Sequence, residues 1–112
     1  MSDEELNAYI IALAWEIKKL LEEHALKPPE LVMKEMERVL EIREEIESYG
    51  ILVNIASRMS PSKPNKLEVE VTLLEPKLNL PPEEQKIYDD WFMEAAERWR
   101  KRQEKKNKNK EQ

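Results

Sequence analysis

The chain has 112 residues, of which 38% are charged and 40% apolar, and it carries a net charge of −5 at pH 7. This length is typical of one domain, and the absence of cysteine excludes disulfides, thiol chemistry and zinc–thiolate sites. No apolar run approaches the ~18 residues that a membrane span needs. The acidic start, Met1-Ser2-Asp3-Glu4-Glu5, is unlike the basic n-region of a signal peptide, so we predict a cytoplasmic protein.

The first predicted helix starts at a capping box. The Ser2 hydroxyl accepts a hydrogen bond from the amide three residues on, and the Glu5 side chain accepts one from the Ser2 amide. One apolar stripe then recurs at spacings of three and four: Leu6, Tyr9, Ile10, Leu13, Ile17, Leu20 and Leu21. Ile11, Ala14 and Trp15 widen this stripe onto a second face. We therefore expect a central helix that packs on two neighbours, with Ile11 and Trp15 as surplus apolar residues for an interaction.

Pro28-Pro29 is expected to end that helix and to begin the next. The second helix has a predicted buried stripe of Val32, Met36, Val39, Ile42, Ile46 and Tyr49. Its opposite, solvent-facing side is predicted to hold Glu37, Arg38, Glu41, Glu44 and Glu45. Gly50 is the only glycine of the chain, and its place after Tyr49 is typical of a left-handed helix stop.

From Ile51 the apolar period changes from 3.6 to 2, which predicts two strands, at 51–58 and 67–74, joined by a loop at 60–65. The second strand has one apolar and one polar face. A lone hairpin is marginal in water, so we expect its apolar face to cover the helices. The charges of Lys63 and Lys66 oppose strand pairing only at the turn end of the ribbon. At least one long strand edge is therefore left open for pairing.

The last predicted helix begins after Pro81-Pro82 and carries an aromatic stripe of Tyr88, Trp91, Phe92, Ala95 and Trp99. This spacing favours a core position for Tyr88, Trp91 and Phe92. For Trp99 it does not decide between a core position and a surface position where the ring could stack on nucleic-acid bases. No apolar residue follows Trp99. We therefore predict one domain over residues 1–99 and a disordered polar tail over 100–112.

Charge is distributed unevenly along the chain. Residues 98–112 contain eight basic and two acidic side chains, a net charge of +6, whereas the other 97 residues contain 11 basic and 22 acidic ones, a net charge of −11. The arginines next to Trp99 are Arg98, Arg100 and Arg102. Such a basic segment suits three roles: a solubility tail, an arm that binds nucleic-acid phosphates, or a strap onto an acidic protein surface, including that of a second copy.

Residues capable of catalysis or metal binding are sparse. His24, the single histidine, falls at the end of the first predicted helix, where the helix dipole explains it without a catalytic role. Glu68 and Glu70 share a strand face and could hold a cation, but alternating glutamates are more typical of a solvated face. One glycine cannot build a phosphate loop. We predict no catalytic residue, no metal site, no cofactor and no small-molecule substrate.

Together these patterns predict a small α+β domain of order α-α-β-β-α, with three helices packed on a two-stranded antiparallel hairpin. The leading functional hypothesis is a non-enzymatic protein-interaction or self-assembling accessory module, of a kind that phages and mobile elements often encode. It would act through the ribbon edge or through Ile11 and Trp15 of the first helix. The alternative is a small nucleic-acid-binding or regulatory protein that acts through the basic C-terminal helix and tail, residues 98–110. Candidate contact residues there are Arg98, Trp99, Arg100 and Arg102. Neither hypothesis involves a membrane.

Overall fold

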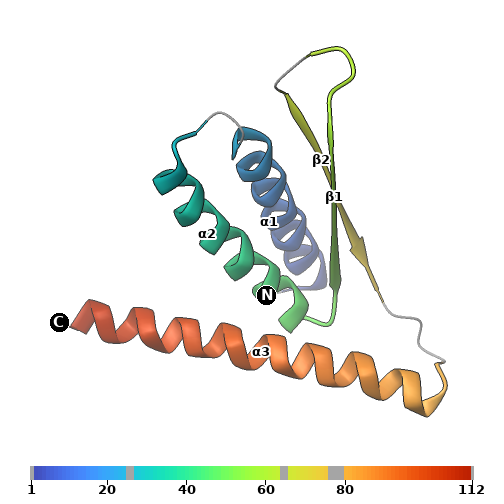
Figure 1. Ribbon diagram of the computed structural model, residues 1–112. Coiled ribbons are helices and arrows are strands. Elements are labelled where there is room, and N and C mark those ends of the chain that lie inside the picture. Colours follow the sequence, from blue (N-terminus) through green and yellow to red (C-terminus); the bar gives the residue numbers. More distant parts are fainter. Residues whose placement is uncertain (1, 25–26, 64–65, 76–79, 112) are drawn as a thin grey trace.

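The computed structural model describes residues 2–24, 27–63, 66–75 and 80–111, and the side chains within them except those of residues 24 and 108–111. Its elements follow the order α1 (Asp3–His24), α2 (Pro29–Ser48), β1 (Leu52–Met59), β2 (Leu67–Leu74) and α3 (Pro82–Glu111). The predicted α+β class and the order α-α-β-β-α are confirmed (Figure 1). Residues 64 and 65 of the predicted loop lie outside the described residues.

Local signals in the sequence fix the ends of the first two helices. The Glu5 amide donates to Ser2 Oγ at 3.2 Å, half of the predicted capping box. Pro28 has an extended backbone, and Pro29 opens α2, where a missing N–H costs nothing. Gly50 has a φ of +82°, and its amide donates to the carbonyl of Glu47. The predicted left-handed stop after α2 is therefore confirmed, and it turns the chain into β1.

The two strands pair antiparallel, and their register matches Val53 with Leu73, Ile55 with Val71, and Ser57 with Val69. These pairs lie on one face of the ribbon, because side chains alternate along a strand. Val53 and Val69 are buried there, while Glu70 and Thr72 on the other face are exposed. The ribbon thus has the apolar and polar faces that the sequence predicted.

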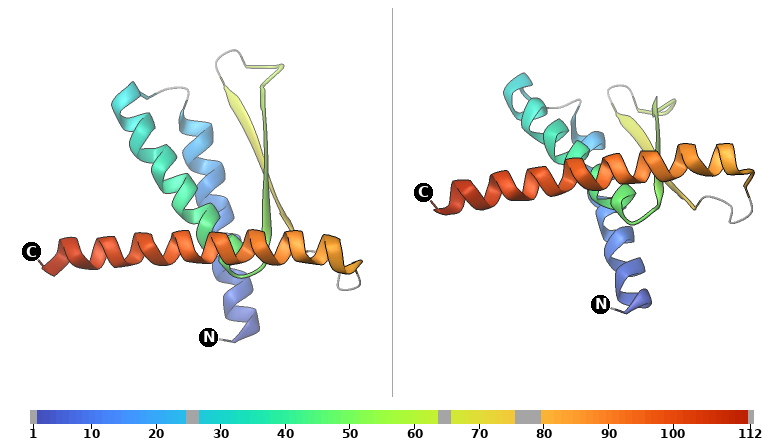
Figure 2. Two further views of the ribbon diagram at one scale, coloured as in Figure 1. Left: turned by 60° about the horizontal axis from the view of Figure 1, so that its bottom comes forward. Right: turned by 90° about the horizontal axis from the view of Figure 1, so that it is seen from below.

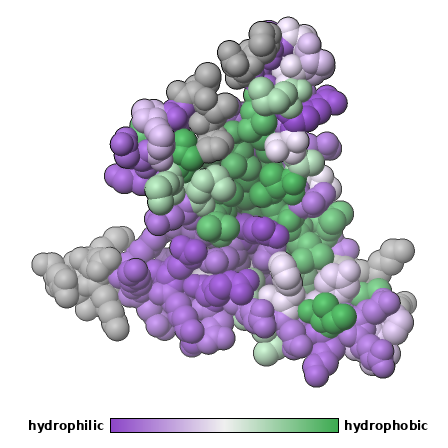
Figure 3. Space-filling view, viewed as in Figure 1, coloured by the Kyte–Doolittle hydropathy of each residue, from purple (hydrophilic) through white to green (hydrophobic). Residues whose placement is uncertain are grey.

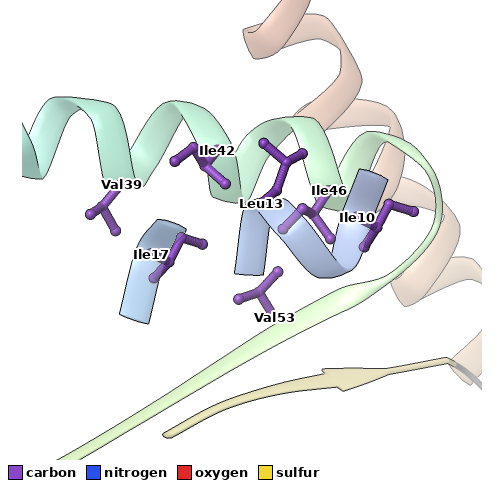
Figure 4. Close-up of a cluster of buried hydrophobic side chains, with 7 residues drawn as sticks. All are labelled: Ile10, Leu13, Ile17, Val39, Ile42, Ile46 and Val53. Atoms are coloured by element: carbon purple, nitrogen blue, oxygen red, sulfur yellow. The ribbon is translucent and has the colours of Figure 1, made fainter. Parts of the chain in front are cut away.

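Between the helices and the ribbon lies one apolar core. Its buried side chains come from α1, α2 and β1 and are Ile10, Leu13, Ile17, Val39, Ile42, Ile46 and Val53 (Figure 4). Val71 and Leu73 of β2 pack against them, partly buried. Burying a side chain of this size contributes about 1.5–3 kcal/mol. We call α1, α2 and the ribbon the body of the molecule.

Helix α3 is placed differently from the prediction. Of the described elements, α3 packs on α2 alone, whereas α1 and α2 cover the ribbon. Two views in Figure 2 show α3 crossing the end of α2 and extending beyond the body at both of its ends. The expectation that all three helices pack on the hairpin is corrected in this respect.

The C-terminal segment also differs from the prediction. Where the sequence predicted a disordered tail over residues 100–112, α3 continues as helix to Glu111. Apart from Asn107 and Asn109, this segment consists of Arg, Lys, Gln and Glu. These are good helix formers, so a lack of apolar residues does not by itself end the helix. The basic segment is therefore part of the long helix.

Candidate interaction surfaces

The basic part of α3 contacts the acidic side of α2. Arg98 Nε lies 3.5 Å from Glu44 Oε1, and Arg102 Nε lies 2.5 Å from Glu44 Oε2. One turn further along α3, Lys106 pairs with Glu41. The hydrogen bond from Arg102 to Glu44 raises the pKa of Arg102 above the usual arginine value. Of the three roles considered for the basic segment, the strap onto an acidic surface is thus realised within the chain itself.

The predicted residues of the basic segment have separate environments. Arg98 and Arg102 are in the ion pairs just described, whereas Arg100 is exposed. Trp99 is only partly exposed, and its Nε1 is buried without a hydrogen-bond partner among the described residues. Trp99 therefore lies at the margin of the α3 contact and does not stand clear of the surface as a base-stacking platform would.

Trp91 occupies a different position from the one predicted. The sequence favoured the core, but its side chain is 43% exposed, because only its Nε1 end points inward. That nitrogen donates to Glu47 Oε2 at 3.0 Å, and Arg43 Nε donates to Glu47 Oε1 at 3.1 Å. Tyr88 and Phe92 are partly buried and stack at 6.5 Å. Ala95, the next residue of the stripe, is fully buried.

Two buried carboxylates at the end of α2 escaped the sequence analysis. Glu45, predicted to face solvent, is 7% exposed, and Glu47 is 2% exposed. The hydroxyls of Tyr9 and Tyr49 donate to Glu45 Oε2, at 2.5 and 3.3 Å. The hydrogen bond from Tyr9 to Glu45, together with burial, raises the pKa of Tyr9 to about 12. Hydrogen bonds of this kind compensate a buried charge. Tyr49 is only four residues from Glu45, but no spacing rule reveals the pairing with Tyr9, 36 residues away.

On the α1 side of the body, Ile11 and Trp15 form the surplus apolar surface expected of the first helix. They are 51% and 63% exposed. Together with Ala14, Lys18 and residues 70–73 of β2, they line a hollow of about 470 Å³. Lys18 Nζ lies 6.0 Å from the centre of the Trp15 ring, close enough for a cation–π contact. The structure therefore brings the two predicted residues together beside the β2 edge.

The two edges of the ribbon are not equivalent. At the β2 edge, the Val69 amide donates to Glu22 Oε2 at 3.2 Å, and the Val69 carbonyl accepts from Lys18 Nζ at 2.9 Å. Both groups therefore point away from β1, so Ser57 and Val69 form a non-hydrogen-bonded pair. By alternation, the N–H and C=O groups of Val53, Ile55, Ser57 and Met59 point away from β2. None of the described residues bonds to them, which leaves the β1 edge open.

An exposed apolar stripe on α2 was also missed. Met33, Met36 and Leu40, which we call the α2 stripe, are 73%, 37% and 45% exposed. Met36, which the helical spacing predicts to be buried, belongs to this exposed stripe instead. Spacings of three and four put these residues on one flank of the helix. In the space-filling view, apolar side chains gather over α2 and β1 (Figure 3).

The positions considered for catalysis or metal binding carry no assembled site. The side chain of His24 lies outside the described residues. Glu68 pairs with Arg58 at 3.1 Å, and Glu70 is exposed. Within the described ranges, no group of three or more histidines, aspartates or glutamates has a metal-binding arrangement. No described helix combines the length and the apolar character that crossing a membrane requires.

Comparisons with known proteins return no family model, no curated protein and no solved structure that matches this chain.

Proposed function

We propose that this chain is a non-enzymatic protein-interaction module that self-associates. The observation that carries the proposal is its surface. The chain exposes 8676 Å², whereas a compact protein of this mass exposes about 6,500 Å². Its radius of gyration is 16.3 Å, against about 13 Å for a compact domain of this length. The surplus arises because α3 extends past the body instead of closing on it.

A partner is the simplest way to cover such a surplus. Interfaces of permanent complexes bury about 2,000–5,000 Å² over both partners, so ~2,200 Å² of surplus per chain is of the size that one such interface removes. Large apolar side chains are exposed on α1, α2, β1 and α3, including Trp15, Met33, Met59 and Ile87. A surface of this composition favours association with protein over a permanently monomeric state.

Nucleic-acid binding, the alternative, has less support. Arg98, Arg102 and Lys106 already pair with carboxylates of α2, and phosphates would have to displace those pairs. The other 97 residues carry a net charge of −11, which repels a polyanion. We expect only weak binding of nucleic acid, lost steeply as salt rises. Cytoplasmic location stays a prediction from the sequence.

The mass in solution tests the proposal. Light scattering behind size exclusion, repeated over a hundredfold range of concentration, should give twice the chain mass or a higher multiple at the upper end. Circular dichroism at each concentration checks that the chain remains folded. A folded protein with the mass of one chain up to high micromolar concentration would contradict self-association.

A further inference from the structure

The β1 edge and the α2 stripe lie on the same flank of the body. Helix α2 contacts α1 through Arg38, which bonds to Glu16, and through Glu45, which accepts from Tyr9. At 100° per residue, Met33, Met36 and Leu40 point to the side of α2 opposite these contacts. Since α1 packs against β2 and α2 against β1, this side of α2 is also the side on which the β1 edge is open.

We infer that a second copy of this chain binds this flank, so that two β1 strands pair antiparallel and two α2 stripes pack together. The inference rests on the proposed self-association and names its surface. It produces a four-stranded sheet with strand order β2-β1-β1-β2, covered on one face by four helices. A twofold axis between the β1 strands makes the interface isologous, as in most dimers.

Several features of β1 favour pairing with its own copy. The strand has eight residues, LVNIASRM, with no proline and with Arg58 as its only charge. Arg58 lies on the outer face, paired with Glu68, so its charge does not point along the edge. Strands that avoid pairing usually carry lysines, prolines or bulges at the edge, and β1 has none of these. Its outward N–H and C=O groups would find partners in the second copy.

The β2 edge is unsuitable for the same purpose. The side chains of Lys18 and Glu22 already occupy the carbonyl and the amide of Val69 in the middle of the strand. An added strand would have to break both hydrogen bonds and displace α1. A second copy also fits this flank better than a short peptide, because an extended peptide could pair with the β1 edge but brings no apolar helix face for the α2 stripe, whereas a second copy brings both.

Two substitutions test the inference, each with a matched control. Ser57→Pro removes an N–H that points away from β2, so the β1–β2 ladder keeps its hydrogen bonds, while Ser57→Ala retains that N–H. Leu40→Lys places a charge in the α2 stripe, while Ile87→Lys places the same charge on α3, at a residue exposed to 66%. We expect Ser57→Pro and Leu40→Lys to raise the dimer dissociation constant at least about tenfold, and both controls to leave it unchanged.

The outcomes separate this inference from the proposed function. If wild type is a dimer and Leu40→Lys dimerises equally well, this flank is not the interface although self-association stands. Dissociation by Trp15→Lys without an effect of Leu40→Lys would move the interface to the α1–β2 hollow and overturn the inference. A monomeric wild type would overturn both. Because Leu40 lies on a helix surface, its variant decides the matter even if Ser57→Pro unfolds.

Discussion

The body and α3 are held in place by different kinds of contact. In the body, seven apolar side chains from three elements form the buried core. Across the α3–α2 contact, Ala95 is buried, but the specific bonds are polar: Trp91 to Glu47, Arg102 to Glu44 and Lys106 to Glu41. Apolar contacts are not screened by salt, whereas partly exposed ion pairs are.

This difference indicates where the chain needs a partner. The body leaves the β1 edge, the α2 stripe and the surface of Ile11 and Trp15 uncovered, and α3 adds length without adding much core. A helix of 30 residues is about 45 Å long, so much of α3 has nothing of its own chain to cover. Ile42→Ala, Trp91→Phe and truncation of α3 test this difference, and the pH dependence of Tyr9→Phe tests the body alone.

Truncating a side chain in the core should have the largest effect on the stability of the protein. Ile42 is fully buried between α1 and α2, so Ile42→Ala should lower the free energy of unfolding by about 2–5 kcal/mol. Chemical denaturation measures this loss. Ile87→Ala on α3, where the side chain is exposed, should change it by less than ~0.5 kcal/mol. Equal losses in both variants would mean that α3 is as tightly packed as the body.

The Trp91–Glu47 hydrogen bond should contribute less to stability than the core side chain does. Trp91→Phe removes one donor from a nearly buried carboxylate that retains Arg43, so unfolding should become easier by ~1–3 kcal/mol. Trp15→Phe is the matched control, because that indole is largely exposed. Urea denaturation of both variants gives the comparison. If Trp91→Phe is as stable as Trp15→Phe, Glu47 does not hold α3.

Shortening α3 should have a smaller effect that depends on salt. Truncation after Trp99 removes Arg102 and Lys106 with their ion pairs to Glu44 and Glu41, each worth about 0.2–1 kcal/mol. The loss should therefore stay below ~2 kcal/mol at low salt and shrink as screening increases. Denaturation curves at low and high salt test this. A large loss that persists in high salt would show that apolar contacts hold the segment.

High pH should weaken the body through Tyr9. Its pKa is raised from 10.0 to about 12 by the hydrogen bond to Glu45 and by burial. A raised pKa means that the stabilisation is complete below pH 10 and is lost as the pH rises towards 12. The stability difference between wild type and Tyr9→Phe should therefore shrink over this range. Thermal unfolding of both proteins across this pH range measures the difference. If the stability difference between wild type and Tyr9→Phe stays constant between pH 10 and 12, the Tyr9–Glu45 bond is contradicted.

Features that depend on neighbouring residues were predictable from the sequence. The Ser2 cap, the Pro28-Pro29 junction, the left-handed Gly50 and the alternation along both strands each follow from the conformational preferences of a few adjacent residues. These features fix the element order. Helical spacing likewise placed Ile11 and Trp15 on a second face of α1, where both are exposed.

Features that depend on distant pairs were not predictable in this way. The buried Glu47 accepts a hydrogen bond from Trp91, 44 residues away, and the buried Glu45 accepts one from Tyr9, 36 residues away. A glutamate in a helical pattern resembles every other solvated glutamate until its partner is known. Likewise, the absence of apolar residues after Trp99 indicated a tail, whereas contacts to Glu41 and Glu44 accompany a continuous helix.

Amide hydrogen exchange at the ribbon edges is the most direct test of pairing between two copies. The amides of Ile55 and Ser57 point away from β2, whereas the Val69 amide is bonded to Glu22 within the chain. We predict that exchange at Ile55 and Ser57 slows as protein concentration rises and the dimer forms, while exchange at Val69 is slow throughout. Fast exchange at Ile55 and Ser57 in a sample shown to be dimeric would contradict pairing through β1.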